Sequence, residues 1–365
     1  MQPELTYKRI DNHHRLVPHD GIFRRRINLV EAVALIMSGA IGAGVLGIPY
    51  AIAQVGVPIG ILSMIIIGTL TLAYNLMLAK IANRAGVPLQ LPGLAERYGG
   101  PIAKWLMVIN MYTLLIGSLM VYIIGEGQTL SALFGGTPLK WSIIFFVVGS
   151  FFVLVGMRTV KVVELIFILA ILGIVLFITL WSVPQITIPN LQYTDLTQIF
   201  FPYGVLLFAF HSSRSIPEAH SLLKDSASSL KSAIWWASIF VTFIYLIFAI
   251  VVVGVTGAGT TEIATIGLGK VLGDGVFMLG NIFAALAMGT SFLMSGVSLR
   301  DSLAWDFKIH SAFAALLVCG IPFVLFLLGM RGFIEAIELL GGVFITTEIV
   351  LMAAIGLRAR KKLPV

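Results

Sequence analysis

Long apolar stretches separated by short polar segments run through almost the whole chain. Between Glu31 and Lys80 there are 48 residues without a charged side chain, enough for two membrane-spanning helices of about 20 residues each. The Gly-Val-Pro at 56–58 marks the turn between them, because proline cannot continue a helix begun before it. The same pattern predicts ten spans, at 28–54, 57–82, 102–126, 139–157, 160–182, 196–222, 231–256, 275–302, 309–329 and 332–357.

The overall composition agrees with this pattern. Of the 365 residues, 58% are hydrophobic and 11% charged, and the mean hydropathy is +1.00, whereas soluble domains carry about 25% charged residues. We therefore expect an all-α polytopic membrane protein whose transmembrane domain, 28–357, lies in the lipid bilayer between polar tails at 1–27 and 358–365. The single cysteine, Cys319, falls within a predicted span and excludes an intrachain disulfide.

The basic residues indicate the orientation of the chain. With the N-terminus inside, 21 of the 24 Lys and Arg residues fall on the cytoplasmic side, and only Lys140, Lys270 and Arg331 fall outside. Cytoplasmic loops are enriched in Lys and Arg, so both termini are expected in the cytoplasm and the protein in the cell membrane. The net charge of +7 then follows from topology. It indicates neither a nucleic-acid partner nor an obligatory protein partner.

The first predicted span is unusually rich in glycine. The segment SGAIGAGVLGIPYA, residues 38–51, has four glycines, each costing a helix interior roughly 1 kcal/mol relative to alanine. Small residues let membrane helices pack closely, which is one explanation. The other is a discontinuous helix whose unpaired backbone groups face a ligand near the middle of the bilayer.

A second interruption favours the discontinuous helix. Five spans later, the apolar run in FPYGVLLFAFHSSRSIPEAH, residues 201–220, gives way to a His-Ser-Ser-Arg-Ser segment and then resumes. Spans 1 and 6 cross the membrane in opposite directions, as expected when two five-helix halves are related by an inverted repeat. The sequence therefore predicts two repeats, 28–182 and 196–357, with helices 1 and 6 both broken.

Four segments resemble the amino acid–polyamine–organocation superfamily, which has the LeuT-type fold. IGAGVLGIPYAIAQVG (41–56) and FPYGVLLFAFHSSRSIPE (201–218) are similar to its first and sixth helices, LAERYGG (94–100) to the segment after helix 2, and SLRDSL (298–303) to the end of helix 8. The amino acid/auxin and tyrosine/tryptophan permease branches look most similar. The resemblance implies a secondary active amino acid transporter working by alternating access, in which spans 1, 2, 6 and 7 move against spans 3, 4, 8 and 9.

The two breaks offer the groups that an amino acid requires. A half-helix N-terminus presents free N–H groups and a positive dipole end to a carboxylate, while the freed carbonyls can accept from the amine. Neither break contains an acidic residue, which favours a neutral substrate, aromatic or bulky aliphatic if Phe and Tyr side chains form the wall. The candidate substrate-binding residues are Ala40, Gly42, Ala43, Gly44, Tyr112, Phe208, Ala209, Phe210 and His211.

The coupling ion has two candidates, sodium and the proton. The spacing of the eighth span is similar to half of the sodium site of LeuT-type symporters, and with the first break it gives the candidate set Ser38, Ile41, Ala287, Thr290 and Ser291. Alternatively, these Thr and Ser hydroxyls bond back to carbonyls of their own helix. Proton coupling points to His211, which titrates near physiological pH, or to Glu348 in the tenth span, where a charged carboxylate is costly.

Other classes of protein fit less well. There is no GxxxxGK[ST] or HExxH motif and no plausible catalytic cysteine, so an enzyme is not expected, and no organic cofactor is indicated. The alternative to a transporter is a nutrient receptor subunit of the spore-germination kind, which has a similar length and fold and binds an amino acid without accumulating it. The sodium-like spacing in the eighth span favours the transporter.

Overall fold

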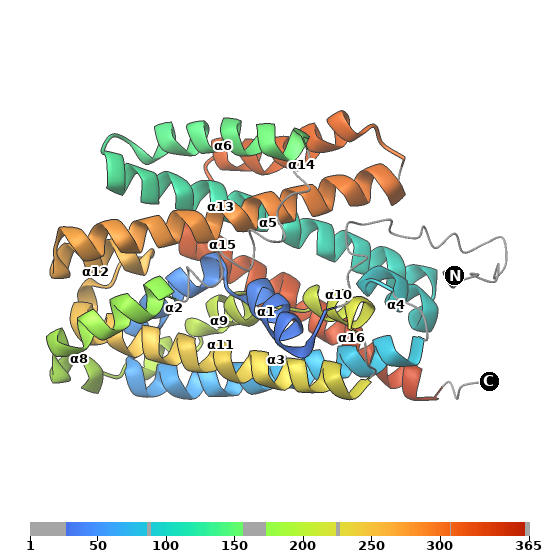
Figure 1. Cartoon of the computed structure of the whole chain (residues 1–365), viewed down its shortest axis with the longest axis horizontal. Helices are drawn as coiled ribbons and strands as arrows, with labels where there is room; N and C mark the ends of the chain where they lie inside the picture. The colour runs from blue at the N-terminus through green and yellow to red at the C-terminus, as the bar shows by residue number, and fades with distance from the viewer. Residues whose placement is uncertain (1–26, 86–88, 156–172, 224–226, 307, 362–365) are drawn as a thin grey trace.

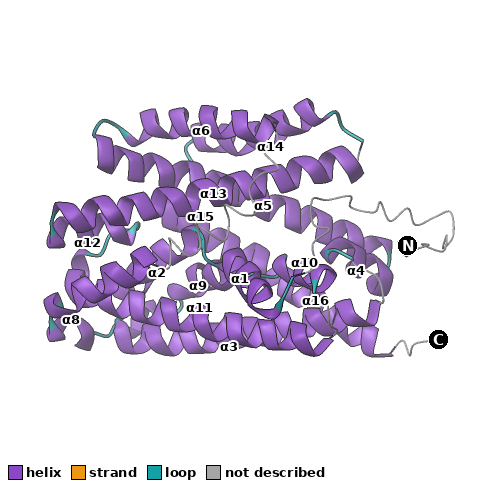
Figure 2. Cartoon of the chain, in the orientation of Figure 1, coloured by secondary structure: helices purple, strands orange, loops and turns teal. Residues whose placement is uncertain are grey.

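The computed structural model describes residues 27–361 except 86–88, 156–172, 224–226 and 307. Its regular structure is helical, and outside the helices the described chain has one isolated bridge, between Ile27 and Leu223 (Figure 2). Six helices are long and apolar enough to cross a membrane, and a bent helix pair makes a seventh. Ser311–Leu327 is a shorter apolar helix, as is the segment Gly173–Gln185. The molecule is therefore an all-α polytopic membrane protein, as the apolar runs predict.

The first span is broken where its glycines predict. Helix α1, Leu29–Ala40, starts with a capping box in which Asn28 and Glu31 bond to each other's backbone N–H at 2.9 Å, an arrangement that satisfies two otherwise free donors. The helix ends when Ile41 turns to extended backbone, and α2, Ala43–Val55, resumes after Gly42. The two halves are bent by 58°.

The sixth span is broken in the same way. Helix α9, Pro202–Phe210, ends at His211, whose backbone is extended at φ −72° and ψ 108°, and α10, Ser215–Leu222, follows. The sixth helix begins at Pro202 rather than at the predicted residue 196, because 196–198 form only a 3-10 turn. Both discontinuities are thus short interruptions flanked by helix, at 41–42 and at 211–214.

The remaining described spans follow the predicted order, with one large shift of boundary. The third helix runs on to residue 134, beyond the predicted 126, and most of the predicted fifth span, 160–182, lies outside the described residues. The tenth span contains a π-helix, Leu340–Ile345. The long helices are α3 (Val57–Ala85), α5 (Pro101–Phe134), α6 (Pro138–Val155), α11 (Ala227–Thr256) and α13 (Asp274–Asp306). The shorter α14 (Ser311–Leu327) follows, and the tenth span contains α15 (Phe333–Leu339) and α16 (Thr346–Lys361).

The helices lie in layers around the two broken spans. Figure 1 shows α3 and α11 side by side along one edge, α6 and α14 along the opposite edge, and α1, α2, α9 and α10 between, with α5 and α13 packed against each other. Short helices mark the two ends of the bundle. Helix α4 (Leu91–Gly99) lies at the end called here the α4 end, while α8 (Ile188–Gln192) and α12 (Ala264–Leu272) lie at the α12 end.

Candidate functional site

The two broken spans touch each other at the level of the backbone. A Cβ atom placed on Gly44, in the first turn of α2, would lie 2.5 Å from the Cα atom of Ala209 in α9, whereas ordinary carbon–carbon contacts are about 3.5–4.0 Å. Only glycine allows this approach. The glycine run of the first span therefore serves close packing as well as the break, and the two explanations given by the sequence both hold.

Tyr245 of α11 joins the two breaks. Its buried hydroxyl lies 3.0 Å from the carbonyl oxygen of Ala40 and 3.1 Å from that of Ala209, and donates toward both. The sequence predicts these carbonyls to accept from a substrate amine, and in the structure the tyrosine hydroxyl donates toward both. Each carbonyl oxygen has a second lone pair that can accept another donor.

The start of α2 keeps the free amides that the sequence predicts. Gly42 is the N-cap residue, and no side chain in the described part of the chain caps this end, so the first N–H groups have no partner within the helix. A Cβ on Gly42 would lie 3.2 Å from Ser291 Oγ and 3.9 Å from the Tyr122 hydroxyl. The amide end of α2 therefore lies beside hydroxyl groups of α13 and α5.

The predicted aromatic residues lie in different surroundings. Tyr112 lies ten residues before Tyr122 in α5, or about 15 Å along the helix, and its hydroxyl is 2.6 Å from Ser302 Oγ. Phe210 is only 5% exposed and packs edge-on against Tyr245, with the ring centroids 5.1 Å apart. Tyr112 and Phe210 therefore each have a partner within the protein, while Phe208 is half-buried beside the break.

Tyr122 is the tyrosine that the sequence reasoning missed. Its hydroxyl interacts with the hydroxyls of Ser291 and Ser295, and the charge of Arg214 acts on it. The predicted third span ended at residue 126, which placed Tyr122 near a membrane surface. Because α5 continues to Phe134, Tyr122 lies closer to the middle of the helix.

The predicted sodium residues are only partly arranged as ligands. Ser291 faces Gly42, which brings the eighth span to the first break. The Thr290 hydroxyl donates within its own helix, to the carbonyl oxygens of Leu286 at 2.7 Å and Ala287 at 3.2 Å. The Ser38 hydroxyl likewise donates to Leu35 at 3.2 Å. Thr290 therefore agrees with the alternative prediction, in which its hydroxyl bonds to carbonyls of its own helix. Binding a cation would require this hydroxyl to rotate away from those carbonyls.

The two proton-coupling candidates lie in contact. Oε1 of Glu348, in the first turn of α16, is 3.1 Å from His211 Nε2, and it accepts from Ser213 Oγ at 2.6 Å and from the Tyr74 hydroxyl at 2.8 Å. Asn75 donates to the neighbouring Ser212 at 3.0 Å. We call Tyr74, His211, Ser213 and Glu348 the polar cluster. Tyr74 and Ser213 were missed because neither stands out among the polar residues of its segment.

A second buried carboxylate lies on α5. Glu126 is 2% exposed, and a Cβ on Gly289 of α13 would lie 3.2 Å from its Oε1. It follows Tyr122 by one helical turn, so both side chains are on one face of α5. The sequence reasoning missed it because the predicted span ended at this residue.

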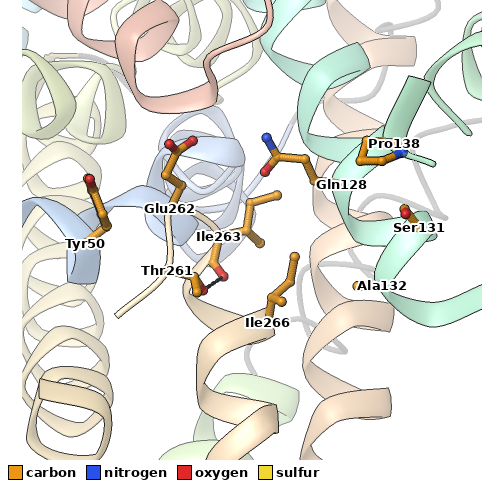
Figure 3. A pocket seen from close by; sticks show the side chains of 9 residues that line it. All are labelled: Tyr50, Gln128, Ser131, Ala132, Pro138, Thr261, Glu262, Ile263 and Ile266. Atoms are coloured by element: carbon orange, nitrogen blue, oxygen red, sulfur yellow. Dashed lines mark hydrogen bonds between the residues drawn. The ribbon is translucent and has the colours of Figure 1, made fainter. Parts of the chain in front are cut away.

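A pocket of about 550 Å³ opens near the α12 end. In Figure 3 the side chains of Gln128 and Glu262 lie at one edge of it, with Tyr50 nearby. Burial and the charge of Glu335 raise the pKa of Glu262, although its carboxylate accepts from two backbone N–H groups at the start of α15. The lining residues are Tyr50, Gln128, Ser131, Ala132, Pro138, Thr261, Glu262, Ile263 and Ile266.

Two broken helices that meet at their interruptions are typical of secondary transporters that bind substrate near the middle of the membrane. In agreement, the fold is similar to the crystal structure of MhsT in complex with L-phenylalanine, with a TM-score of 0.69, 14% sequence identity and coverage of 94% of each chain. The chain belongs to the tryptophan/tyrosine permease family, whose sequence profile matches residues 25–365.

Two curated relatives are also amino acid transporters. Glutamine transporter 2 of Aliivibrio fischeri is 28% identical over 284 residues, which cover 73% of each chain. Tyrosine-specific transport system 2 of Haemophilus influenzae is 26% identical over 337 residues, 84% of this chain and 82% of the relative. The resemblance seen in the sequence is confirmed, and the protein is an amino acid transporter and not an enzyme.

Proposed function

We propose that the protein takes up a neutral amino acid, with an aromatic or bulky aliphatic side chain, by cation-coupled alternating access. The observation that carries this proposal is the meeting of the two breaks, where Gly44 packs on Ala209 and the start of α2 keeps its amides free. No acidic residue lies in either break to bind a cationic side chain. Tyrosine, glutamine and phenylalanine, named for the similar proteins, are all neutral.

The substrate carboxylate would bind at the amides of Gly42, Ala43 and Gly44, where the half-helix dipole favours negative charge. The ammonium group would bind at the carbonyls on the opposite side, using the second lone pairs of Ala40 and Ala209. Tyr122 replaces Tyr112 as the tyrosine beside the substrate, and Phe208 supplies apolar surface. In this arrangement, backbone groups bind the carboxylate and the ammonium group, which all amino acids share.

The moving part would be the broken spans with α3 and α11, and the scaffold would be α5, α6, α13 and α14. The Tyr245 bridge supports this division, because it ties α11 to both breaks. The distribution of basic residues supports placing the α4 end and both termini in the cytoplasm, with the protein in the cell membrane. The pocket at the α12 end would then open outward.

Sodium and the proton both remain candidates for the coupling ion. A sodium ion would lie between the first break and α13, with Ser38, Ile41, Ala287, Thr290 and Ser291 as ligands. Contact between Ser291 and Gly42 supports this site, whereas the internal hydrogen bonds of Thr290 do not. The contact between His211 and Glu348 in the polar cluster favours the proton as the coupling ion.

The test is uptake by purified protein in proteoliposomes. Labelled L-tyrosine, L-phenylalanine and L-glutamine are offered under an imposed sodium gradient and, separately, under a pH gradient, with empty vesicles as the control. Accumulation above the external concentration under either gradient is the expected result. Binding in detergent without accumulation under any gradient would contradict transport and would favour the receptor.

A further inference from the structure

The polar cluster places a carboxylate where a lone charge is unfavourable. Glu348 is fully buried, and its Oε1 receives hydrogen bonds from the break of span 6 and from α3. Its Oε2 has no hydrogen-bond partner within the described part of the chain. A buried polar atom without a partner costs about 1–3 kcal/mol, so this arrangement needs a reason beyond packing.

His211 is the ionisable partner of this carboxylate. The groups that act on Glu348 are His211, Ser213 and Tyr74, and of these only His211 can carry a positive charge. None of the other charged side chains described on α16, on the rest of its span or on the helices packed against it forms an ion pair with Glu348. They are Lys80, Arg84, Glu96, Arg97, Lys104, Glu126, Glu335, Glu338 and Arg358. Arg214, on the same break as His211, acts on Tyr122 instead.

The proton content of the pair sets its charge. With one exchangeable proton the pair is an imidazolium beside a carboxylate, and its net charge is zero. Releasing that proton to water leaves a neutral imidazole and a carboxylate, with a net charge of −1. A single buried charge is far more costly than a paired one. The protonated pair, which is neutral overall, is therefore compatible with the buried position of Glu348. The deprotonated pair, with its single negative charge, requires water or a rearrangement of the helices.

The position of His211 provides both access and movement. Its side chain is 8% exposed whereas that of Glu348 is 0% exposed, so a proton reaches the pair through His211. The residue also follows the last turn of α9, on extended backbone. Movement of the half-helices during transport would therefore change the distance between His211 and Glu348.

We propose that His211 and Glu348 form one buried proton-binding site, positioned by Tyr74 and Ser213, that couples proton entry to amino acid transport. One proton enters from the outer solution with the substrate, is held by the pair in the closed state, and leaves to the cytoplasm when the break moves. This inference rests on the proposed function. It makes the proton, and not sodium, the ion that drives accumulation.

The first measurement needs no transport. Affinity for L-phenylalanine, L-tyrosine and L-glutamine is measured in detergent between about pH 5 and 8. If one proton binds with the substrate, the wild-type affinity falls as the pH rises, by at most about tenfold per pH unit. Glu348→Gln, which keeps an oxygen acceptor for Tyr74 and Ser213, should remove this dependence, and so should His211→Asn if the first variant fails to fold.

The second measurement uses proteoliposomes without sodium. Addition of the amino acid should acidify a pH dye inside wild-type vesicles, and Glu348→Gln should lose both this signal and accumulation. Glu96→Gln is the matched control, because Glu96 pairs with Lys104 at 2.9 Å at the α4 end and should behave as wild type. Accumulation by Glu348→Gln at the wild-type level, or sodium-driven accumulation without acidification, would overturn the proton site.

The two proposals fail in different ways. If wild-type protein accumulates substrate without moving protons, the proton site is wrong and the transporter stands. If it does not accumulate substrate but its binding depends on pH through Glu348, the pair does bind a proton with the substrate, and the transport function is wrong.

Discussion

Replacing Gly44 with alanine tests the contact between the two breaks. The new Cβ would lie 2.5 Å from Ala209 Cα and 2.8 Å from its Cβ, so α2 and α9 must separate by about 1 Å to restore an ordinary contact. That shift would stretch the Tyr245 hydrogen bonds, now 3.0 and 3.1 Å, beyond the usual range of about 2.7–3.2 Å. Overpacking costs about 1–3 kcal/mol, and the weakened bond adds about 1 kcal/mol.

Binding and thermal unfolding measure this cost. If about 1–3 kcal/mol of this cost appears in the free energy of substrate binding, Gly44→Ala should bind substrate about 5- to 150-fold more weakly. The variant should also have a lower Tm. The control is Gly320→Ala in α14, where a Cβ meets no atom within 4 Å, so affinity and Tm should not fall. Wild-type affinity and Tm in Gly44→Ala would refute the reasoning that the breaks touch at this glycine.

Four further substitutions test the breaks and the pocket. Tyr245→Phe removes the hydroxyl that links the two breaks, so it should lower the Tm and weaken substrate binding severalfold; an unchanged affinity would show that the bridge is dispensable. Tyr122→Phe should weaken binding whereas Tyr112→Phe should not, and equal effects in an equilibrium binding assay would contradict this assignment. Because the pKa of Glu262 is raised above 4.5 by burial and by Glu335, wild-type stability should decrease as the pH rises through the raised value. Glu262→Gln should lose this decrease when the Tm is followed against pH, and parallel curves for the two proteins would refute it.

The sequence predicts best those features that depend on neighbouring residues. The glycines around Gly42 and the serines after His211 locate both helix breaks, because each segment weakens its own helix. Long apolar runs locate the spans for the same reason. Boundaries shift where a turn such as 196–198 interrupts an apolar stretch, or where α5 continues past its predicted end.

Contacts between distant segments could not be predicted in this way. Tyr74 and Glu348 are 274 residues apart, and Tyr245 and Ala40 are 205 apart, so no local pattern connects them. His211 and Glu348 were both recognised as unusual in a membrane, since each is an ionisable residue in an apolar span. That they lie together depends on how the helices pack. Tyr122 was not singled out, because the predicted end of the third span at residue 126 placed it near the end of its helix.

The π-helix Leu340–Ile345 determines which way Glu348 faces. A π-helical turn holds more residues than an α-helical turn, so it accommodates an extra residue without rotating the helix beyond it. If the same residues formed an ordinary α-helix, Glu348 would be rotated by about 100° and would turn away from His211 while every residue of the polar cluster stayed unchanged. The contact between spans 6 and 10 thus depends on an irregularity of the backbone that residue identities alone do not reveal.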